Sequence, residues 1–255
     1  MKIAVCVKHA VDETELKIGP SGSPILAGAA AKISTFDKNA VEEALRLRSN
    51  LGGEVVVFSV GVPDARKSMK EAMAMGAERG VHVVADTEKF DSLLVSALLA
   101  KAIQKYGPFD IVLCSEGASD TYCAQVPPML AELLGLPYAG YARKIEVSGT
   151  SSKVERALED SVEVVECPIP FAASVVSEIN EPRYPTLIQI MQASKKPVEE
   201  TTPQALGVAV DQAMVKVVSS SAQPMNRKRV ILEGTTEESA AKLIEALAKE
   251  GVISR

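Results

Sequence analysis

The chain has 255 residues and can bury a large core, in one large domain or in two. Its 47% hydrophobic and 24% charged residues are typical of a soluble globular protein, and 4% aromatic residues with no Trp predict an aliphatic core. A net charge of −5 argues against a nucleic-acid-binding surface, which needs clustered Lys and Arg. No apolar run reaches the roughly 18 residues that span a membrane. Because the N-terminal stretch MKIAVCVKHA is unlike a signal peptide, we expect a cytoplasmic protein without direct membrane insertion.

The four cysteines are scattered and form no C-x-x-C pair, so reduced thiols are expected. Cys6 and Cys114 lie in apolar runs and are predicted to belong to the core. Neither of the two histidines, His9 and His82, has a helical spacing from another ligand type. No metal site is therefore expected.

The first half of the chain alternates between apolar runs and amphipathic segments. Strands are predicted at 2–8, 54–61, 79–85 and 110–115, and helices at 37–53, 64–77, 91–107 and 124–137. Continuous apolar strands in a strand–helix repeat predict a parallel sheet with helices on both faces. In such an α/β fold, ligands bind beyond the carboxyl ends of the strands, at a switch in strand order.

The pattern changes at residue 140, where alternating strands replace the strand–helix repeat. Two strands flank a turn at 149–152, and the runs 161–167 and 171–177 are expected to extend this antiparallel meander. A last amphipathic helix is predicted at 235–251. The expected organisation is an α/β core at 1–193, which includes the antiparallel extension, and an arm at 194–255 that lies either on this core or on a partner.

Common catalytic motifs are absent from the sequence. It contains no G-x-G-x-x-G after the first strand, no P-loop, no G-x-S-x-G and no H-E-x-x-H. Acidic pairs such as Glu159-Asp160 are interpreted as solvated surface charges. No nucleophile is paired with a base, so the chain is not expected to be an enzyme in its own right.

The loop from Ser115 to Val126 is the strongest candidate for a ligand site. It joins the fourth predicted strand to a helix and combines small residues, hydroxyls and the carboxylate of Asp120. Small residues let a ligand approach the backbone, and N–H groups at the start of a helix attract phosphate. The alternative is an ordinary loop in which Ser119, Asp120 or Thr121 caps the helix.

The segment STFD at 34–37 is a second candidate, directly before the first helix. Asp37 either caps this helix or accepts a hydrogen bond from a ribose hydroxyl or an adenine amine. Cys6 at the end of the first strand, with Val60 and Gly61 at the end of the second, would complete a cleft around it.

The stretch from Asn180 to Met191 joins a polar segment containing two prolines to an apolar run. Apolar residues exposed on a polar mount indicate a contact site. For Leu187, the alternative is packing within this chain at the start of a helix.

Over almost its whole length, the sequence resembles the beta subunit of electron transfer flavoproteins. The resemblance includes VCVKHAVD, STFDKNAVEEALRL, AMAMGAERGVHVV and SEGASDTYCAQV. It rests above all on VERALEDSVEVVECPIPFAASVV and NEPRYPTLIQIMQASKKP, because long patterns with fixed Asn, Pro, Arg and Tyr positions rarely arise by chance. It implies an adenine nucleotide alpha hydrolase-like core with an antiparallel β extension, and a C-terminal helical arm packing on an alpha subunit.

The resemblance also implies a function. Family members form a heterodimer with an alpha subunit and carry electrons from acyl-CoA or other dehydrogenases to an acceptor such as a quinone oxidoreductase. FAD is shared with the alpha subunit, and the beta subunit binds AMP or a second FAD. The chain would then be an electron carrier that takes part in electron bifurcation only with the alpha subunit and partners. A stand-alone adenine-nucleotide-binding sensor or stress-type domain is the alternative.

The resemblance assigns two groups of site residues. The nucleotide pocket would consist of Cys6, Ser34, Thr35, Phe36, Asp37, Val60, Gly61, Ser115, Ala118, Ser119, Asp120, Thr121, Tyr122, Cys123, Ala124, Gln125 and Val126. The partner-binding residues would be Pro182, Arg183, Tyr184, Leu187 and Ile188, with Leu187 as the anchor that enters an apolar pocket on the dehydrogenase.

Some positions depart from the family pattern. Ser34-Thr35 stands where Asn-Pro is common, Glu116 replaces a cation near the nucleotide, and Tyr122 replaces an acid. Asp37, where simple carriers often have Cys, slightly favours the bifurcating type, and hence a second FAD over AMP.

Overall fold

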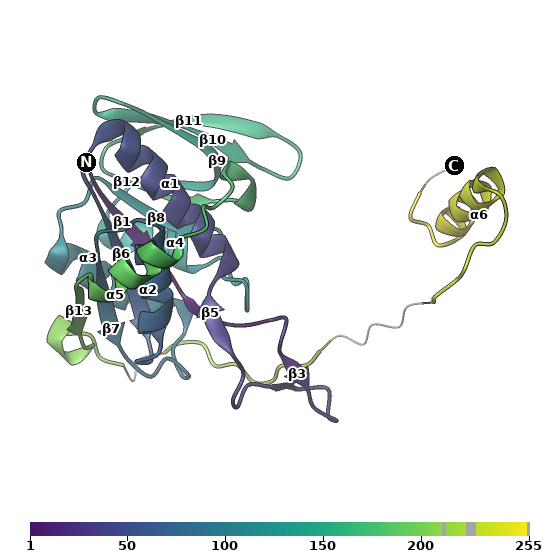
Figure 1. The fold of residues 1–255 in the computed structure, drawn as a ribbon, viewed down its shortest axis with the longest axis horizontal. Coiled ribbons are helices and arrows are strands. Elements are labelled where there is room, and N and C mark those ends of the chain that lie inside the picture. Colours follow the sequence, from purple (N-terminus) through teal and green to yellow (C-terminus); the bar gives the residue numbers. More distant parts are fainter. Residues whose placement is uncertain (211–212, 223–227, 254–255) are drawn as a thin grey trace. The chain divides into compact units, whose positions relative to one another are not determined.

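A computed structural model describes residues 1–210, 213–222 and 228–253. The chain divides into two compact units, residues 1–220 and residues 221–255. The first unit is built on a nine-stranded sheet with the order β11-β10-β9-β12-β8-β1-β6-β7-β13 (Figure 1). The predicted α/β fold with an antiparallel extension is therefore confirmed.

Neighbouring strands run parallel over most of this sheet. Its parallel part consists of β9 (Tyr138–Ser148), β12 (Phe171–Val175), β8 (Ile111–Ser115), β1 (Lys2–Cys6), β6 (Glu54–Gly61), β7 (Arg79–Val84) and β13 (Val198–Thr201). Strand β8 follows β7 in the chain but pairs with β1 on its far side, so the strand order switches between β1 and β8. Ligands in open α/β sheets bind at such a switch.

The antiparallel extension is smaller than expected. It consists of β10 (Ser151–Ala157) and β11 (Val162–Pro168), which pair antiparallel with each other, while β10 also pairs antiparallel with β9. The expectation that 171–177 continues this meander is wrong, because β12 pairs parallel with both β8 and β9. Its five residues are all buried, which is the pattern of a strand covered on both faces.

Helices cover both faces of the sheet. One face packs against α1 (Thr35–Leu51) and α2 (Ala65–Met75), and the other against α3 (Ser92–Tyr106) and α4 (Val126–Leu134). The short helix α5 (Leu187–Lys195) contributes Ala193 to the α1–α2 side. The core is mainly aliphatic, as the composition predicts, with Phe58 and Phe171 among its largest fully buried side chains.

The segment between β1 and α1 is more ordered than the predicted polar loop. Strands β2 (His9–Val11) and β5 (Ala31–Ile33) form one antiparallel pair, and β3 (Lys17–Ile18) and β4 (Pro24–Ile25) form another. Two single-turn 3-10 helices, η1 (Ser177–Ile179) and η2 (Gln204–Leu206), follow later in the chain.

The second unit contains the helix α6 (Thr236–Lys249), close to the predicted 235–251. Thr235 and Glu238 form a reciprocal capping box at its start, which accounts for this boundary. Among the described residues of the whole chain, no helix is long and apolar enough to cross a membrane.

Candidate functional site

The candidate nucleotide site lies where the strand order switches. Cys6 ends β1 and Ser115 ends β8, and the two strands pair in register through Val5 and Leu113. On the other side of β1, β6 ends at Gly61. The fold thus brings three of the predicted pocket segments to one edge of the sheet.

Asp37 occupies the centre of this edge. It is 5% exposed, and its carboxylate accepts a hydrogen bond from the Lys8 backbone N–H at 2.6 Å. Its other oxygen lies 2.5 Å from Ser115 Oγ. The alternative of Asp37 as a helix cap is wrong, because α1 begins at Thr35 with Ser34 as its cap residue. Asp37 instead lies inside the first helical turn and joins α1 to the ends of β1 and β8.

Burial raises the pKa of Asp37 to about 7, outweighing the hydrogen bonds from Ser115 and Lys8 that favour its charged form. The contacts of Ser115 agree with a protonated carboxyl. Its Oγ carries a single proton but lies within hydrogen-bond distance of two oxygens, Asp37 Oδ1 at 2.5 Å and Gly117 O at 2.9 Å. When Asp37 is protonated, its carboxyl O–H can donate to Ser115 Oγ instead of accepting from it, and Ser115 can then donate to Gly117 O, so that all three groups are satisfied.

The loop between β8 and α4 is fastened to the start of α1 and to the residues after β1. Asp120 accepts from Lys8 Nζ at 2.7 Å and from the Val11 N–H at 3.3 Å, and the Ser119 N–H donates to Ser34 Oγ at 3.2 Å. The loop residues are therefore held by side chains rather than used as caps. The cap of α4 is Gln125, so the alternative that Ser119, Asp120 or Thr121 caps this helix is wrong.

Tyr122 closes the loop over Phe36. The two rings pack edge to face with centroids 5.7 Å apart, and Tyr122 remains 50% exposed. A Cβ atom at Gly117 would lie 3.0 Å from the Tyr122 ring, so Gly117 gives the ring its space. Tyr122 and Ala124 adopt positive φ angles of 44° and 54°. Left-handed backbone at two non-glycine residues fixes an unusual loop shape at this site.

The first turn of α4 offers fewer amides than a typical phosphate-binding helix. The helix begins at Val126, and Pro127 and Pro128 follow, neither of which has an N–H. The Met129 N–H already donates to Gln125 O. The start of α4 therefore offers fewer amides for phosphate than expected, because proline occupies two of its first three positions.

The remaining predicted pocket residues lie on the same segments. Val60 and Gly61 are the last two residues of β6, and Thr35 is the first residue of α1. Ala118 O accepts from the Tyr122 N–H at 2.9 Å, and Cys123 is exposed. Sequence reasoning overlooked Lys8, which contacts both acids of the site. Its position directly after the first predicted strand is the signal that would have identified it.

The predicted partner-binding residues form an exposed surface at the start of α5. Leu187 is 80% exposed and begins the helix, and Tyr184, Ile188 and Met191 are also exposed. The alternative that Leu187 packs within this chain is wrong, because the rest of the chain covers only a small part of its side chain. Thr186 and Gln189 form a capping box, which determines where the helix begins.

The polar residues before α5 attach this helix to α1 by hydrogen bonds and an ion pair. The guanidinium of Arg183 donates to both carboxylate oxygens of Glu42, each at 2.7 Å, while Pro182 precedes it in the chain. Asn39 Nδ2 donates to Asn180 O at 2.9 Å, and Asn180 Nδ2 donates to Asn39 O at 3.0 Å. A bidentate ion pair and a reciprocal amide pair thus fix the segment from Asn180 to Arg183.

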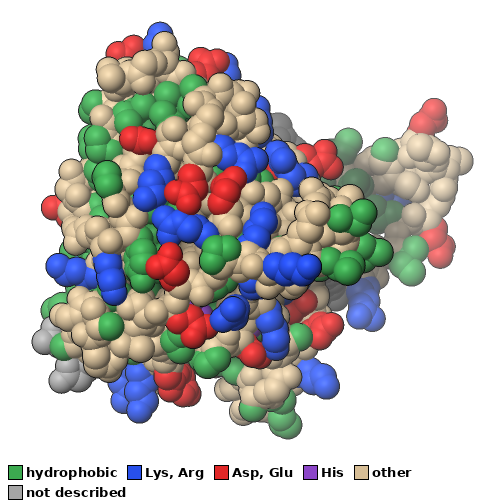
Figure 2. Space-filling view, turned by 60° about the vertical axis from the view of Figure 1, so that its left-hand side comes forward, with side chains coloured by type: hydrophobic (Ala, Val, Ile, Leu, Met, Phe, Trp, Pro, Cys, Tyr) green, Lys and Arg blue, Asp and Glu red, His purple; other side chains and the backbone are tan. Residues whose placement is uncertain are grey.

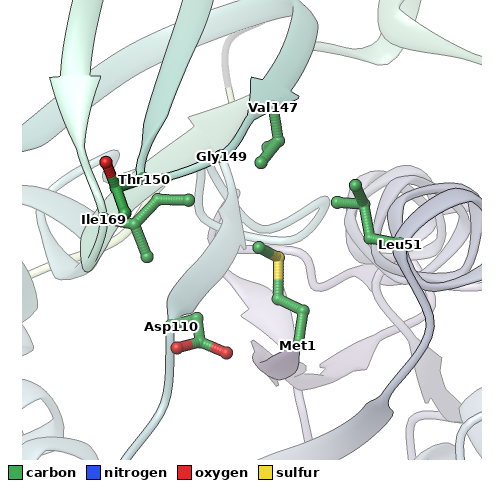
Figure 3. Close-up of a pocket in the computed structure, with 7 residues that line it drawn as sticks. All are labelled: Met1, Leu51, Asp110, Val147, Gly149, Thr150 and Ile169. Atoms are coloured by element: carbon green, nitrogen blue, oxygen red, sulfur yellow. The ribbon is translucent and has the colours of Figure 1, made fainter.

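Two surface cavities lie away from this edge. The larger, of about 450 Å³, is at the amino ends of β1 and β8, where the side chain of Met1 points toward Val147, with Leu51 on one side and Ile169 on the other (Figure 3). The other, of about 430 Å³, lies between α3 and α4. Of the residues that the structure describes, none predicted for the nucleotide site lines either cavity.

The charge distribution matches the low net charge. On the face shown in Figure 2, Lys and Arg side chains are interspersed with Asp and Glu. This mixture differs from the clustered basic surface that binds nucleic acid. Within the described ranges, no group of three His, Cys, Asp or Glu side chains is arranged to hold a metal ion.

Comparisons with known proteins agree with the resemblance. The family described as "Electron transfer flavoprotein domain" matches residues 25–206. A protein named electron transfer flavoprotein subunit beta from Thermoanaerobacterium thermosaccharolyticum is 36% identical over 262 residues, covering 99% of this chain and 100% of the relative. One of the same name from Clostridium acetobutylicum is 36% identical over 265 residues, with the same coverage. The chain therefore belongs to the electron transfer flavoprotein family, as a member of the beta-subunit type.

Proposed function

We propose that the chain is the beta subunit of a heterodimer that carries electrons from an acyl-CoA or other dehydrogenase to an acceptor such as a quinone oxidoreductase. An alpha subunit shares the redox FAD, which supplies the electron-carrying chemistry when bound. The observation that carries this proposal is the exposure of Leu187 at the start of α5. The segment before this helix is fixed to α1 by the Arg183–Glu42 ion pair and the amide contacts between Asn39 and Asn180. Electron bifurcation would require the alpha subunit and further partners.

The exposed start of α5 has the chemistry of a transient docking site. Leu187, Ile188 and Met191 present apolar side chains, and Tyr184 is 90% exposed beside them. A short-lived redox encounter buries a small interface and depends on a few anchor residues. Leu187 is the proposed anchor, with Pro182, Arg183, Tyr184 and Ile188 as its surroundings.

The chain itself would bind an adenine nucleotide, either AMP or a second FAD, at the carboxyl edge of the sheet. The donor set there favours the dinucleotide. Pro127 and Pro128 remove two amides from the start of α4, and the acids Glu116 and Asp120 lie on the adjoining loop. A diphosphate diester spreads its two charges over two phosphates, whereas the terminal phosphate of AMP concentrates them where few donors remain.

The arm predicted at 194–255 is proposed to pack on the alpha subunit through its C-terminal part. In α6, Leu243 and Ile244 are 48% and 59% exposed. Val230 and Ile231, which precede α6 in the chain, are also exposed. Apolar residues of this kind on an amphipathic helix are typical of a surface that another chain covers.

Cofactor counting tests the composition of the complex. The chain is co-expressed with an alpha subunit of the same family, and the purified heterodimer is denatured to release its nucleotides. Chromatography is expected to find two FAD per heterodimer, or one FAD and one AMP if the site prefers the mononucleotide. A chain that copurifies with no flavin-bearing partner would contradict the proposal.

Substitution of Leu187 by Ala tests the docking role. Leu187→Ala is expected to leave nucleotide content and the free energy of unfolding within about 0.5 kcal/mol of the wild type, because the side chain is exposed. It should raise the KM for an acyl-CoA dehydrogenase. Leu26→Ala is a matched control, since Leu26 is 61% exposed and lies in a loop outside α5. Equal effects of both substitutions would argue against a specific docking role for Leu187.

A further inference from the structure

In the lysine exchange, a lysine of α2 hydrogen-bonds to carbonyl groups at the C-terminal end of α5, and a lysine directly after α5 hydrogen-bonds to carbonyl groups at the C-terminal end of α2. Lys70 projects from α2 to the last carbonyls of α5, and Lys196, directly after α5, projects to the carbonyls at the end of α2. The two helices are 123 residues apart at the contact between Lys70 and Ala193. Each lysine therefore places a positive charge at the C-terminus of the other helix, where a cation stabilises the negative end of the helix dipole.

The Lys70 ammonium has a complete set of acceptors. Its Nζ donates to Ala193 O at 3.0 Å, to Ser194 O at 3.0 Å and to Lys196 O at 2.6 Å. A lysine has three N–H donors, so all of them are used. Two of these acceptors belong to the last turn of α5, where Ala193 O also accepts from the Lys196 N–H at 3.1 Å.

The Lys196 ammonium makes the reciprocal contacts. Its Nζ donates to Met73 O at 2.8 Å and to Ala77 O at 2.7 Å, around the end of α2 at Met75. Burial lowers the pKa of both Lys70 and Lys196, as expected for amines enclosed by protein. The carbonyl groups offset this desolvation with charge-assisted hydrogen bonds.

The lysine exchange connects α5 to the sheet. Pro197 O accepts from the Gly80 N–H at 3.0 Å, and β13 begins at Val198 beside β7. Of the nine residues of α5, only Ala193 is buried. A helix this short is not stable by itself, so contacts at its two ends must hold it in place.

We propose that Lys70 and Lys196 are positioning residues that fix the orientation of α5 and thereby the place at which Leu187 is presented to a partner. The proposal rests on the docking role given to α5 above. Arg183 and Glu42 hold the N-terminal side of this helix, and the lysine exchange holds its C-terminal side. Neither lysine needs to touch the partner for its loss to weaken docking.

The test compares Lys70→Met and Lys196→Met with the wild type as purified heterodimers. Met keeps the length of the side chain and removes the cation. Amide hydrogen exchange in α5 is expected to accelerate about tenfold, because charge-assisted hydrogen bonds that hold the helix are lost. In the same variants, the KM for a purified acyl-CoA dehydrogenase should rise while kcat at saturating dehydrogenase is unchanged.

Lys67→Met is the matched control. Lys67 lies on the same helix, but its side chain is 73% exposed and, among the residues that the structure describes, pairs only with Asp64, at 2.8 Å. This variant should exchange α5 amides at the wild-type rate and keep the wild-type KM. An effect equal to that of Lys70→Met would attribute the change to lost charge in general and overturn the proposal.

The two readouts separate this proposal from the docking proposal. Unchanged exchange in α5 would overturn the positioning role, whatever the kinetics. Faster exchange with an unchanged KM would also overturn it, provided that Leu187→Ala raises KM. If neither Lys70→Met nor Leu187→Ala changes KM while exchange accelerates, the docking function of α5 is refuted instead.

Discussion

Substitution of Asp37 by Asn tests whether this buried carboxyl is protonated in the folded protein. Asn has the shape of the protonated acid and cannot ionise. Its oxygen can accept from the Lys8 N–H, and its amide can donate to Ser115 Oγ, which then donates to Gly117 O. The three contacts seen in the structure are therefore preserved.

The expected effect on stability depends on pH. The pKa of Asp37 is raised from 3.8 to about 7, so its contribution to folding is complete below about pH 4 and is lost as the pH rises through 7. At about 1.4 kcal/mol for each pH unit, this difference corresponds to about 4 kcal/mol. Asp37→Asn should remove this loss and be more stable than the wild type at pH 8 by up to about 4 kcal/mol.

Urea denaturation at pH 5 and pH 8, followed by circular dichroism, measures the two free energies of unfolding. Asp12→Asn is the control with the opposite sign. Hydrogen bonds from Lys32 and Thr14 lower the pKa of Asp12 from 3.8 to about 2, so this substitution should destabilise the chain equally at pH 5 and pH 8 and lose its effect only below about pH 4. If Asp37→Asn is less stable than the wild type at both pH values, Asp37 is ionised and the reasoning is refuted.

Three further substitutions test the packing that positions the site. Glu42→Gln should lower the free energy of unfolding by about 1 kcal/mol in urea titrations, since it removes the charge from the partly exposed Arg183 pair; no change would exclude a stabilising ion pair. Gly53→Ala should lower the Tm by at least about 5 °C, because its Cβ would lie 1.7 Å from Met1 O at a φ of +113°; an unchanged Tm would contradict that crowding. Phe58→Ala should cost about 3–5 kcal/mol, since Phe58 is fully buried, and a loss below about 1 kcal/mol would show that the core refills the space.

Local pattern was sufficient to predict four strands of the parallel core and the helices between them. The runs that became β1, β6, β7 and β8 are short, apolar and bounded by turn residues, so each strand is specified by its own residues. The helices between them repeat apolar residues with helical spacing. These signals need no information about distant residues.

The mistaken predictions concern pairing. Sequence order predicts that the run 171–177 continues the antiparallel meander, yet its strand β12 lies between β8 and β9. Its continuous burial was the signal of a central strand. The sequence predicts the helix α4, but the number of amides at its start depends on the position of its first residue, Val126, which places Pro127 and Pro128 in the first turn.

Periodicity and motif identity are local properties, so the fold class, the family and the segments of the candidate site could be predicted from the residues alone. How those segments meet is a property of the tertiary structure. Asp37 contacts Ser115 across 78 residues, and Lys70 contacts Ala193 across 123. It also showed that Leu187 is exposed within this chain rather than packed in its core. Burial and long-range hydrogen bonds depend on how distant segments pack, and no single stretch of sequence encodes that arrangement.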